Sequence, residues 1–202
     1  MSLYPLMLDG SALSAVIVGG GAVATRKASA LVASGARVRV VAPAFAPELE
    51  SLGRDSTIEL VNALYSTEQL RDAQLVIAAT NDEALNARIA ADAKALGRLV
   101  NVASAPSEGN CVTPAVHRSG DVVVAVTAGG VPTAAARIRD DLARRLDGRY
   151  ASAVKELSSL RRSLIDRDLR ARWSSATAAL LDEDFCERVE SGRFDDAVSE
   201  WR

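Results

Sequence analysis

Cysteine is one of the scarcest residues in this sequence, with only Cys111 and Cys186 among 202 residues. The two lie far apart in the chain and form no C-x-x-C pair, so they cannot build a disulfide framework or a redox motif. Proteins that rely on disulfides are mostly secreted, whereas isolated cysteines are typical of reducing compartments. We therefore expect a cytoplasmic protein.

Histidine is scarcer still, and metal-binding patterns are missing from the sequence. His117 is the one imidazole in the chain, and no H-E-x-x-H, C-x-x-C or clustered carboxylate motif accompanies it. We expect no resident metal site. Any imidazole chemistry near neutral pH would have to use His117.

The sequence also lacks a strong charge of one sign and a long apolar run. Its formal net charge is −2 and its isoelectric point is about 5.5, which argues against nucleic acid as the main partner because phosphate binding needs a broad basic face. No apolar stretch reaches the length of about 18 residues that a membrane span needs. The first residues carry no basic region of a signal peptide, so we expect no membrane partner.

What the chain does contain is the composition of a folded globular protein, with 49% hydrophobic and 25% charged residues. Its length suits one substantial domain with an appendage, or two small domains. The sequence contains neither an internal repeat nor a low-complexity tract.

The most informative stretch is Val16–Ala28, where an apolar β-branched run breaks into three glycines and resumes as a helix-forming segment. Gly19, Gly21 and Ala24 fill the G-x-G-x-x-G/A spacing of a dinucleotide pyrophosphate site. The first glycine permits a tight turn, the second lets backbone approach the pyrophosphate, and Ala24 allows close packing of helix on strand. The anion would lie on the free amides of the helix that opens near Ala22.

Strand and helix patterns alternate around this motif. Strand-like runs begin near residues 15, 37, 58, 75 and 99 and are separated by helical segments, which predicts a doubly wound parallel sheet. Ligands of such sheets bind at the carboxyl ends of the strands. We expect four such ends to converge on one crevice: Gly19–Ala22, Pro43–Ala44, Thr80–Asn81 and Ala103–Ser104. The connecting segments are expected to include an edge strand or plug at Tyr4–Leu8, a helix at Phe45–Gly53, a strand at Thr57–Val61 and a capped helix start at Ser66–Asp72.

Two positions in this half leave alternatives open. The second strand runs into Ala42-Pro43-Ala44 instead of an acidic residue for the ribose hydroxyls, so ribose recognition must come from backbone or another loop. The missing acid removes one argument for NAD over NADP, and Arg37 and Arg39 are poorly placed to clamp a 2′-phosphate. Asn101 interrupts the apolar run of the fifth strand and needs a partner, either structural or a ligand.

The pattern changes after residue 103. Val112–Val116 and Asp121–Thr127 are predicted as a strand pair joined by a turn at His117–Gly120, and a charged helix is expected from about Ala134 to Leu146. This unit is too small to bury its own apolar face, so we expect it to pair with a copy of itself. Residues 150–202 have helical periodicity and few strand signals.

Five motifs carry a resemblance to a known family: YPLML at Tyr4–Leu8, VIVGGGAVATRKA at Val16–Ala28, AATND at Ala78–Asp82, NVASAP at Asn101–Pro106 and VAVTAGG at Val124–Gly130. In this order and spacing they are far more specific than the glycine triplet alone. The chain resembles the bacterial precorrin-2 dehydrogenase / sirohydrochlorin ferrochelatase family, which also forms the N-terminal module of siroheme synthase.

The resemblance implies an α/β fold with an NAD-binding Rossmann domain at residues 1–112, a small α+β dimerisation region at 113–148 and a C-terminal helical domain at 149–202. It implies a homodimer that oxidises precorrin-2 to sirohydrochlorin, with a hydride passing to NAD and a proton to a base, on the route to siroheme or cobalamin. It favours NAD as the cofactor and assigns it to the following positions: Gly19, Gly21, Ala22, Val23, Pro43, Ala44, Thr80, Asn81 and Asn101.

The chain departs from the family pattern near the expected tetrapyrrole site. The family commonly reads N-V-x-D-x-P at the fifth strand end, with the aspartate implicated in catalysis, and this chain has Ser104 there. Family members often carry Ser-Ser where this chain has Thr127-Ala128. Ser104 and His117 are the candidate catalytic residues, and the loss of the aspartate argues against the chelatase step.

A tetrapyrrole carries many carboxylates, so basic side chains are candidate anchors through charge-assisted hydrogen bonds. The candidates are Arg26, Lys27, Arg118, Arg137 and Arg139, although arginines on helix surfaces are usually solvated. The alternatives to a dehydrogenase are a bifunctional dehydrogenase and ferrochelatase, or a non-catalytic module that binds NAD or a tetrapyrrole. Hydride transfer chiefly requires that cofactor and substrate be held in contact, which favours the enzyme.

Overall fold

The β-branched runs of the first half pair into one parallel sheet in the computed structural model, which describes residues 2–55 and 58–202. The chain divides into two units, an N-terminal unit of Met1–Thr113 and a C-terminal unit of Pro114–Arg202. The boundary between them lies one residue beyond the end expected for the Rossmann domain. The further division of the C-terminal unit into a dimerisation region and a helical domain stays a prediction.

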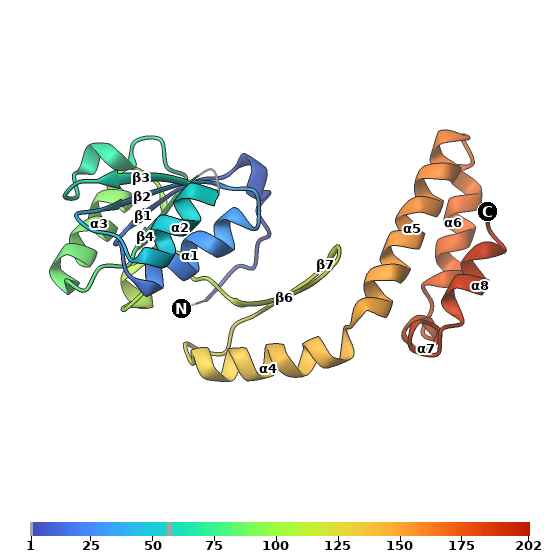
Figure 1. Cartoon of the computed structure of the whole chain (residues 1–202). Coiled ribbons are helices and arrows are strands. Elements are labelled where there is room, and N and C mark those ends of the chain that lie inside the picture. The colour runs from blue at the N-terminus through green and yellow to red at the C-terminus, as the bar shows by residue number, and fades with distance from the viewer. Residues whose placement is uncertain (1, 56–57) are drawn as a thin grey trace. The chain divides into compact units, whose positions relative to one another are not determined.

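The sheet of the N-terminal unit consists of β1 (Ser14–Val18), β2 (Arg37–Ala42), β3 (Ile58–Asn62), β4 (Leu75–Ala78) and β5 (Leu99–Val102). Its strand order is β3-β2-β1-β4-β5, with every pairing parallel (Figure 1). The chain moves outward from β1 to β3 and then returns to β4 on the other side of β1, so the topological switch point lies between β1 and β4. The predicted doubly wound sheet is confirmed.

Three helices connect these strands: α1 (Ala22–Val32), α2 (Pro47–Asp55) and α3 (Glu83–Ala95). Shorter 3₁₀ turns lie at η1 (Gly10–Ala12), η2 (Thr67–Leu70) and η3 (Pro106–Glu108). α3 is capped by the preceding Asp82, whose carboxylate accepts from the Leu85 amide at 3.0 Å. It ends before Gly97, whose φ of 69° lies in the left-handed region that favours glycine.

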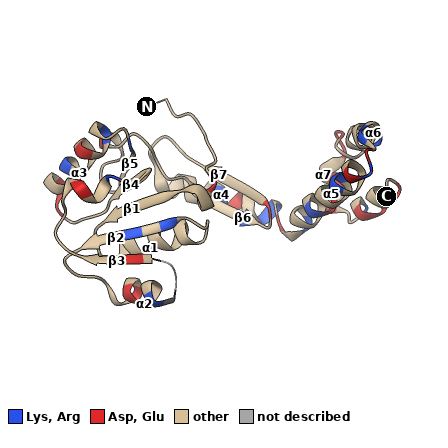
Figure 2. Ribbon diagram, turned by 90° about the horizontal axis from the view of Figure 1, so that it is seen from above, with Lys and Arg blue, Asp and Glu red and all other residues tan. Residues whose placement is uncertain are grey.

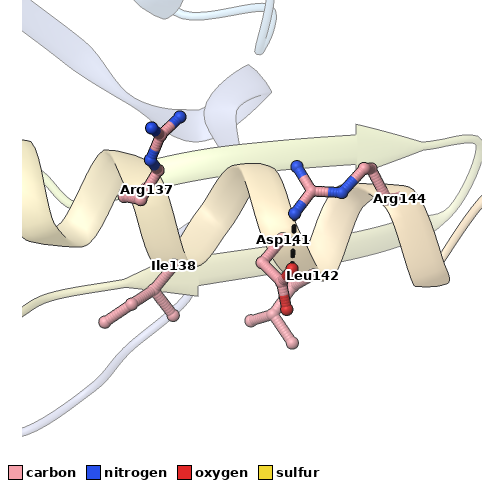
Figure 3. A pocket seen from close by; sticks show the side chains of 5 residues that line it. All are labelled: Arg137, Ile138, Asp141, Leu142 and Arg144. Atoms are coloured by element: carbon pink, nitrogen blue, oxygen red, sulfur yellow. Dashed lines mark hydrogen bonds and ion pairs between the residues drawn. The ribbon is translucent and has the colours of Figure 1, made fainter.

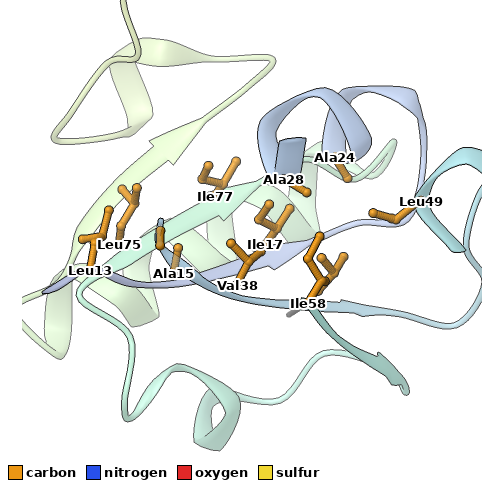
Figure 4. Close-up of a cluster of buried hydrophobic side chains, with 12 residues drawn as sticks. Leu13, Ala15, Ile17, Ala24, Ala28, Val38, Leu49, Ile58, Leu75 and Ile77 are labelled. Carbon is orange, nitrogen blue, oxygen red and sulfur yellow. The ribbon is translucent and has the colours of Figure 1, made fainter. Parts of the chain in front are cut away.

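Helices cover both faces of the sheet, so two layers of apolar contacts hold the unit together. On one face Ile17 packs with Ala24 and Ala28 of α1 (Figure 4), and on the other Val76 packs with Ile89 of α3. Both alanines of α1 are 0% exposed, and their small side chains let the helix lie close to the strand. Burial on both faces explains the near-continuous apolar composition of these strands.

Two expectations for this half are corrected by the structure, and a third extends beyond the described residues. Tyr4–Leu8 forms no edge strand, since none of the described strands pairs with it, and Tyr4 is 87% exposed. Ser66–Asp72 forms only the short η2, which is closed by reciprocal hydrogen bonds between Ser66 and Gln69. The third strand begins at Ile58, and Thr57 lies outside the described residues.

The C-terminal unit opens with the antiparallel pair β6 (Ala115–Ser119) and β7 (Val122–Val126). The pair itself was predicted, but its first strand begins at Ala115 instead of Val112. His117 therefore lies within β6, opposite Val124, and not in the connecting turn. The turn falls at Gly120, whose φ is 55°.

The shifted start of β6 has a local cause in the N-terminal unit. The residues just before it run back along β5, where the amides of Asn110 and Cys111 donate to the Val100 carbonyl at 2.9 and 3.2 Å. A side chain on Gly109 would come within 2.5 Å of that same carbonyl oxygen. Val112 therefore belongs to a segment that covers the edge of the parallel sheet, not to β6.

The rest of the C-terminal unit is helical: α4 (Pro132–Arg145), α5 (Gly148–Asp166), α6 (Arg170–Leu180), α7 (Phe185–Glu190) and α8 (Phe194–Ser199). Leu160 and Leu164 of α5 are buried together with Leu180 and Phe194 in a core of their own. The small antiparallel sheet and the helical C-terminal region agree with the predicted fold class, which is confirmed.

Charge on the sheet of the N-terminal unit is concentrated on β2 and β3 (Figure 2). Arg39 of β2 and Glu59 of β3 are register partners and form an ion pair at 2.7 Å. Arg37 donates to the Ser14 hydroxyl at 2.9 Å. Both arginines of β2 therefore have partners at some distance from the strand's carboxyl end.

Candidate functional site

The glycine loop after β1 is pressed between the ends of two neighbouring strands. Gly19 has a φ of 130°, and a side chain on it would come within 2.3 Å of the Ala79 carbonyl oxygen after β4. A side chain on Gly20 would come within 1.9 Å of the Ala44 carbonyl oxygen after β2. The Gly20 carbonyl also accepts from the Ala46 amide at 2.8 Å. The loop thus requires glycine at two positions and joins three strand ends.

Gly21 differs from its two neighbours because a side chain on it would meet nothing within 4 Å. It is exposed and precedes the first residue of α1 without any side-chain cap. The first helical hydrogen bond runs from the Thr25 amide to the Gly21 carbonyl at 3.0 Å. The amides of Ala22–Ala24 therefore precede the first donor of the helix and lie at its positive end. Free amides beside open space fit the pyrophosphate of a dinucleotide.

The end of β2 offers backbone and apolar surface but no acidic group. Pro43 and Ala44 are exposed beside Gly20. The side-chain amide of Asn62 donates through Nδ2 to the Pro43 carbonyl at 3.1 Å and fixes the loop. A ribose placed here would meet main-chain groups, as the sequence led us to expect.

The ends of β4 and β5 are joined by Asn86, a residue of α3 that was not singled out from the sequence. Its side chain is 1% exposed and hydrogen-bonds to Thr80 on one side and to Ser104 on the other. Asn81 is exposed next to Thr80. An asparagine at a position of α3 that faces the sheet was the available sequence signal, because buried amides are retained only where partners exist.

Asn101 has a structural partner and one atom without a partner. Its Nδ2 donates to the Cys111 carbonyl at 3.2 Å, which anchors the segment that runs back along β5. Its Oδ1 is buried and has no hydrogen-bond partner among the described residues. Both alternatives left open by the sequence therefore stand, since a structural bond and a free acceptor coexist in one side chain.

Lys27 of α1 is half-buried and donates to the Thr113 hydroxyl. Burial lowers the pKa of its ammonium group, and the neighbouring charge of Arg26 lowers that pKa further. Burial also raises the pKa of the nearby Cys111 thiol. Lys27 is thus a fixed cation without a carboxylate partner among the described residues, whereas Arg26 is exposed.

The remaining candidates lie in the C-terminal unit. His117 is half-buried, and its Nε2 donates to the Leu146 carbonyl at 3.1 Å, which leaves Nδ1 as the acceptor nitrogen. Arg139 pairs with Asp140 at 2.7 Å. Arg118 is exposed on β6. Their roles as catalytic residue or anchors stay predictions.

A hollow of about 430 Å³ lies on α4, lined by Arg137, Ile138, Asp141, Leu142 and Arg144. Ile138 and Leu142, one helical turn apart, project from the same side of the helix (Figure 3). Ile138 is 47% exposed and Val131 just before α4 is 51% exposed. This helix therefore leaves apolar side chains uncovered.

No group of three or more histidine, cysteine, aspartate or glutamate side chains is arranged to hold a metal ion within residues 2–55 and 58–202. No helix in those same ranges has the length and apolar character needed to cross a bilayer.

Comparison with known proteins matches a family model described as "Putative NAD(P)-binding" to residues 6–115. A siroheme synthase of Chromobacterium violaceum is 36% identical over 199 residues, which is 98% of this chain and 41% of that protein. A siroheme synthase of Ectopseudomonas mendocina is 39% identical over 168 residues, 83% of this chain and 35% of that protein. This chain thus spans well under half the length of these curated relatives.

A solved structure titled "SirC, precorrin-2 dehydrogenase" matches along nearly all of this chain. It superposes with a TM-score of 0.75 at 28% sequence identity, and the match covers 98% of this chain and 100% of that protein. The similarity therefore extends through the strand pair and the helices of the C-terminal unit as well as the parallel sheet.

Proposed function

This chain belongs to the NAD(P)-binding family whose model covers residues 6–115, and on that premise we propose that it is an NAD-dependent precorrin-2 dehydrogenase. The resemblance drawn from the five sequence motifs agrees with siroheme synthases similar over as much as 98% of the chain and with the precorrin-2 dehydrogenase structure. The reaction would remove a hydride and a proton from precorrin-2 and yield sirohydrochlorin, as part of siroheme or cobalamin synthesis.

The observation that supports this proposal most is the geometry at Gly21. The open space at Gly21, beside an uncapped helix start, contributes no packing contact to the fold. The neighbouring Gly19 and Gly20, by contrast, are needed for packing against Ala79 and Ala44. A pyrophosphate accounts for that space because it would accept from the free amides of α1. When bound, NAD supplies the hydride acceptor, and the protein supplies position.

We assign the remaining cofactor contacts by position along the carboxyl edge of the sheet. Gly19, Gly21, Ala22 and Val23 would hold the pyrophosphate, and the loop of Pro43 and Ala44 would contact the adenosine ribose. Thr80, Asn81 and Asn101, on the β4 and β5 side, would hold the nicotinamide half. The free Oδ1 of Asn101 is a suitable acceptor for an amide donor.

NAD is a better fit than NADP at the end of β2. A 2′-phosphate is normally held by an arginine near that end, and here Arg37 donates to Ser14 while Arg39 pairs with Glu59. Neither is available without breaking an existing contact. We therefore propose NAD as the physiological cofactor.

The direct test is a turnover assay. Purified protein mixed with precorrin-2 and NAD should produce NADH absorbance and the spectrum of sirohydrochlorin, and NADP should support a far lower rate. Gly21→Asp, which fits the apo fold, should produce neither signal. NAD binding without any NADH formation in the wild-type protein would favour the non-catalytic binding module instead.

We also propose that the chain contributes little to metal insertion, against the bifunctional alternative. Ser104 is an exposed neutral hydroxyl that neither binds Fe²⁺ or Co²⁺ strongly nor accepts a proton near neutral pH. His117 has one ring nitrogen already engaged with Leu146. Incubation with sirohydrochlorin and Co²⁺ should give metal insertion close to a no-protein control; insertion well above that control, unchanged in His117→Ala, would contradict the proposal.

We propose further that two copies of the chain form a homodimer through residues 113–148. None of the residues of β6 and β7 is fully buried, and Val131 and Ile138 are about half exposed. Arg137, Asp141 and Arg144 beside Ile138 carry opposite charges that suit an antiparallel copy of α4. A second copy would cover this surface.

Sedimentation of the full chain should therefore report twice 21.2 kDa. Ile138→Arg should shift the protein toward the monomer, because a buried unpaired charge is costly at an interface. Leu181→Arg is a matched control, since Leu181 is also 47% exposed but lies after α6. A wild-type monomer at micromolar concentration would contradict the dimer.

The compartment follows from the cysteines. Cys111 and Cys186 are both unpaired thiols, which suits a reducing environment. Together with bacterial biosynthetic relatives, this supports our proposal that the enzyme acts in the cytoplasm.

A further inference from the structure

Asn86 is a buried amide that uses both of its polar atoms to join two loops. Its Oδ1 accepts from the Thr80 amide at 3.1 Å and from the Thr80 hydroxyl at 2.8 Å. Its Nδ2 donates to the Thr80 carbonyl at 3.0 Å and to the Ser104 hydroxyl oxygen at 3.5 Å. The side chain is 1% exposed, so no solvent competes for these positions. The loops after β4 and β5 are thus connected through one residue of α3.

The chemistry of an amide decides the direction of the Ser104 contact. The Thr80 amide can only donate and the Thr80 carbonyl can only accept, so these two contacts fix the orientation of the Asn86 side chain and place its NH₂ group toward Ser104. An NH₂ group only donates, and the Ser104 oxygen must therefore accept. The hydroxyl proton of Ser104 is then free to be donated elsewhere. Ser104 itself is exposed, so that proton is available to a ligand.

We propose that Asn86 is a positioning residue that makes Ser104 a hydrogen-bond donor to the substrate. The chemical class it would take is an acceptor group, and on a tetrapyrrole the acceptors at hand are the side-chain carboxylates. In this the inference rests on the proposed function for the identity of the ligand. Ser104 then holds the substrate in place and takes no proton from it, so the proton released on oxidation must leave by another route.

The same amide predicts what a charged residue at position 104 would do. In Ser104→Asp the new carboxylate would accept from Asn86 Nδ2 and would present only acceptors to the ligand. Like charges would then oppose each other where Ser104 offers a proton. The identity of residue 104 therefore selects between attraction and repulsion of a substrate carboxylate, while Asn86 remains the same.

The test measures binding of sirohydrochlorin to the full-length protein without NAD, by quenching of the fluorescence of the tetrapyrrole. Ser104→Ala should weaken binding by about tenfold, and Ser104→Asp by more than that, because a charge-assisted hydrogen bond is lost in the first and replaced by repulsion in the second. Both changes lie at an exposed position, so the fold, followed by circular dichroism, should be unaltered. Wild-type affinity in Ser104→Ala would overturn the proposal.

Asn86→Asp tests the positioning role itself. Its carboxylate still accepts from the Thr80 amide, but in place of the Nδ2 donor it presents an acceptor to the Thr80 carbonyl and to the Ser104 hydroxyl. Ser104 would then donate inward and be lost to the ligand. Sirohydrochlorin binding should weaken about tenfold near pH 8 relative to wild type. It should recover as the pH is lowered and the buried carboxyl becomes protonated and donates again. Protonation would also restore the bond to the Thr80 carbonyl, so the pH dependence shows that the carboxyl matters, and the double variant decides whether it acts through Ser104.

The double variant Asn86→Asp with Ser104→Ala separates action through Ser104 from general damage. If Asn86 acts through Ser104, the double variant should bind sirohydrochlorin as Ser104→Ala does. An additional loss from Asn86→Asp in the Ser104→Ala background would overturn the proposal, as would failure of the wild type to bind sirohydrochlorin. Wild-type binding of sirohydrochlorin with no NADH formed from precorrin-2 would instead refute the proposed function and leave this inference in place.

Discussion

The two units of this chain solve the problem of burying apolar surface in different ways. The N-terminal unit covers both faces of its sheet with its own helices, so Ile17, Val40 and Val100 are all 0% exposed. In the C-terminal unit the strands β6 and β7 contain no fully buried residue. Its apolar core lies instead among α5, α6, α7 and α8. The same molecule therefore contains a sheet whose two faces are buried within one chain and a strand pair whose residues are only partly buried.

The polar contacts of the two units differ as well. Buried amides organise the strand ends of the N-terminal unit, where Asn86 is 1% and Asn101 is 4% exposed. Exposed ion pairs are frequent in the C-terminal unit, for example Arg193 with Glu187 and Arg145 with Asp141. Neutral hydrogen bonds inside a core fix geometry, whereas exposed ion pairs contribute little and are screened by salt.

This difference indicates where precision is required. A dinucleotide site needs backbone held to within fractions of an ångström, and the N-terminal unit supplies a rigid edge of strand ends for it. The C-terminal unit leaves the residues of β6 and β7 short of full burial, and the dimer proposed above would cover them. The following expectations test that contrast.

The largest expected effect is the loss of cofactor binding in Gly21→Asp. Bulk and negative charge would enter the space that the pyrophosphate needs, and NADH affinity should fall on the order of 100-fold or more. The fold should survive because a side chain at Gly21 meets nothing within 4 Å. Gly148→Asp is the matched control, since Gly148 also begins a helix beside open space. NADH titration followed by fluorescence measures both, and equal affinities of Gly21→Asp and wild type would sink the dinucleotide site.

Removal of core side chains should affect each unit separately. Ile17→Ala and Leu164→Ala each leave a cavity at a position that is 0% exposed, and each should lower the free energy of unfolding by about 2–5 kcal/mol. Trp173 and Trp201 are the only tryptophans and both lie in the C-terminal unit, so tryptophan fluorescence reports on that unit and NADH binding on the other. Ile17→Ala should move the NADH-binding transition in urea and Leu164→Ala the fluorescence transition. A common shift of both transitions would show that the units unfold as one.

The effect of salt on the urea unfolding of the two units should differ by a smaller amount. Raising the sodium chloride concentration to about 0.5 M shortens the range of charge interactions to a few ångströms, and exposed ion pairs contribute at most about 1 kcal/mol each. We expect the fluorescence transition to move to lower urea and the NADH-protected transition to change less. Glu187→Gln, which removes the charge that pairs with the exposed Arg193, should reduce the salt dependence. An equal response of the two transitions would contradict the contrast in polar contacts.

The smallest effect concerns Asp92 at acid pH. Hydrogen bonds from the Thr67 and Tyr65 hydroxyls hold the pKa of Asp92 below its usual value of 3.8. The stability it contributes is therefore fully present above pH 3.8 and is lost as the pH falls through the lower folded-state pKa. Asp92→Asn should flatten this part of the acid unfolding curve, followed by far-ultraviolet circular dichroism. An acid transition identical to that of wild type would show that these hydrogen bonds do not couple protonation of Asp92 to the stability of the fold.

Much of the fold could be predicted because its signals are local. The run of β-branched residues before Gly19, the glycines themselves and the small Ala24 and Ala28 identify a strand, a turn and a close-packed helix without reference to distant residues. The alternation of strands and helices after them then leaves few topologies, since crossover connections are right-handed and parallel strands need a helix between them. The predicted order of elements and the convergence of strand ends follow from this.

Other features depended on contacts between segments far apart in the chain. Val112 has strand propensity, yet the amides of Asn110 and Cys111 bond to Val100 and draw the segment along β5, so β6 begins later and includes His117. Tyr4–Leu8 is apolar but no described strand edge accepts it. Propensity states what a segment prefers, and hydrogen-bond partners decide between preferences of similar energy.

The sequence by itself determined the doubly wound class, the glycine loop and the positions where a dinucleotide would lie, because each depends on residue type and spacing within a few turns of chain. Only the tertiary structure decided that Gly20 is needed for packing while Gly21 faces open space, and that the side chain of Asn86 reaches Ser104. These properties depend on distances between atoms of different strands and helices. The physical reason is that donor direction and steric space are set by neighbours in three dimensions, which residue order alone does not specify.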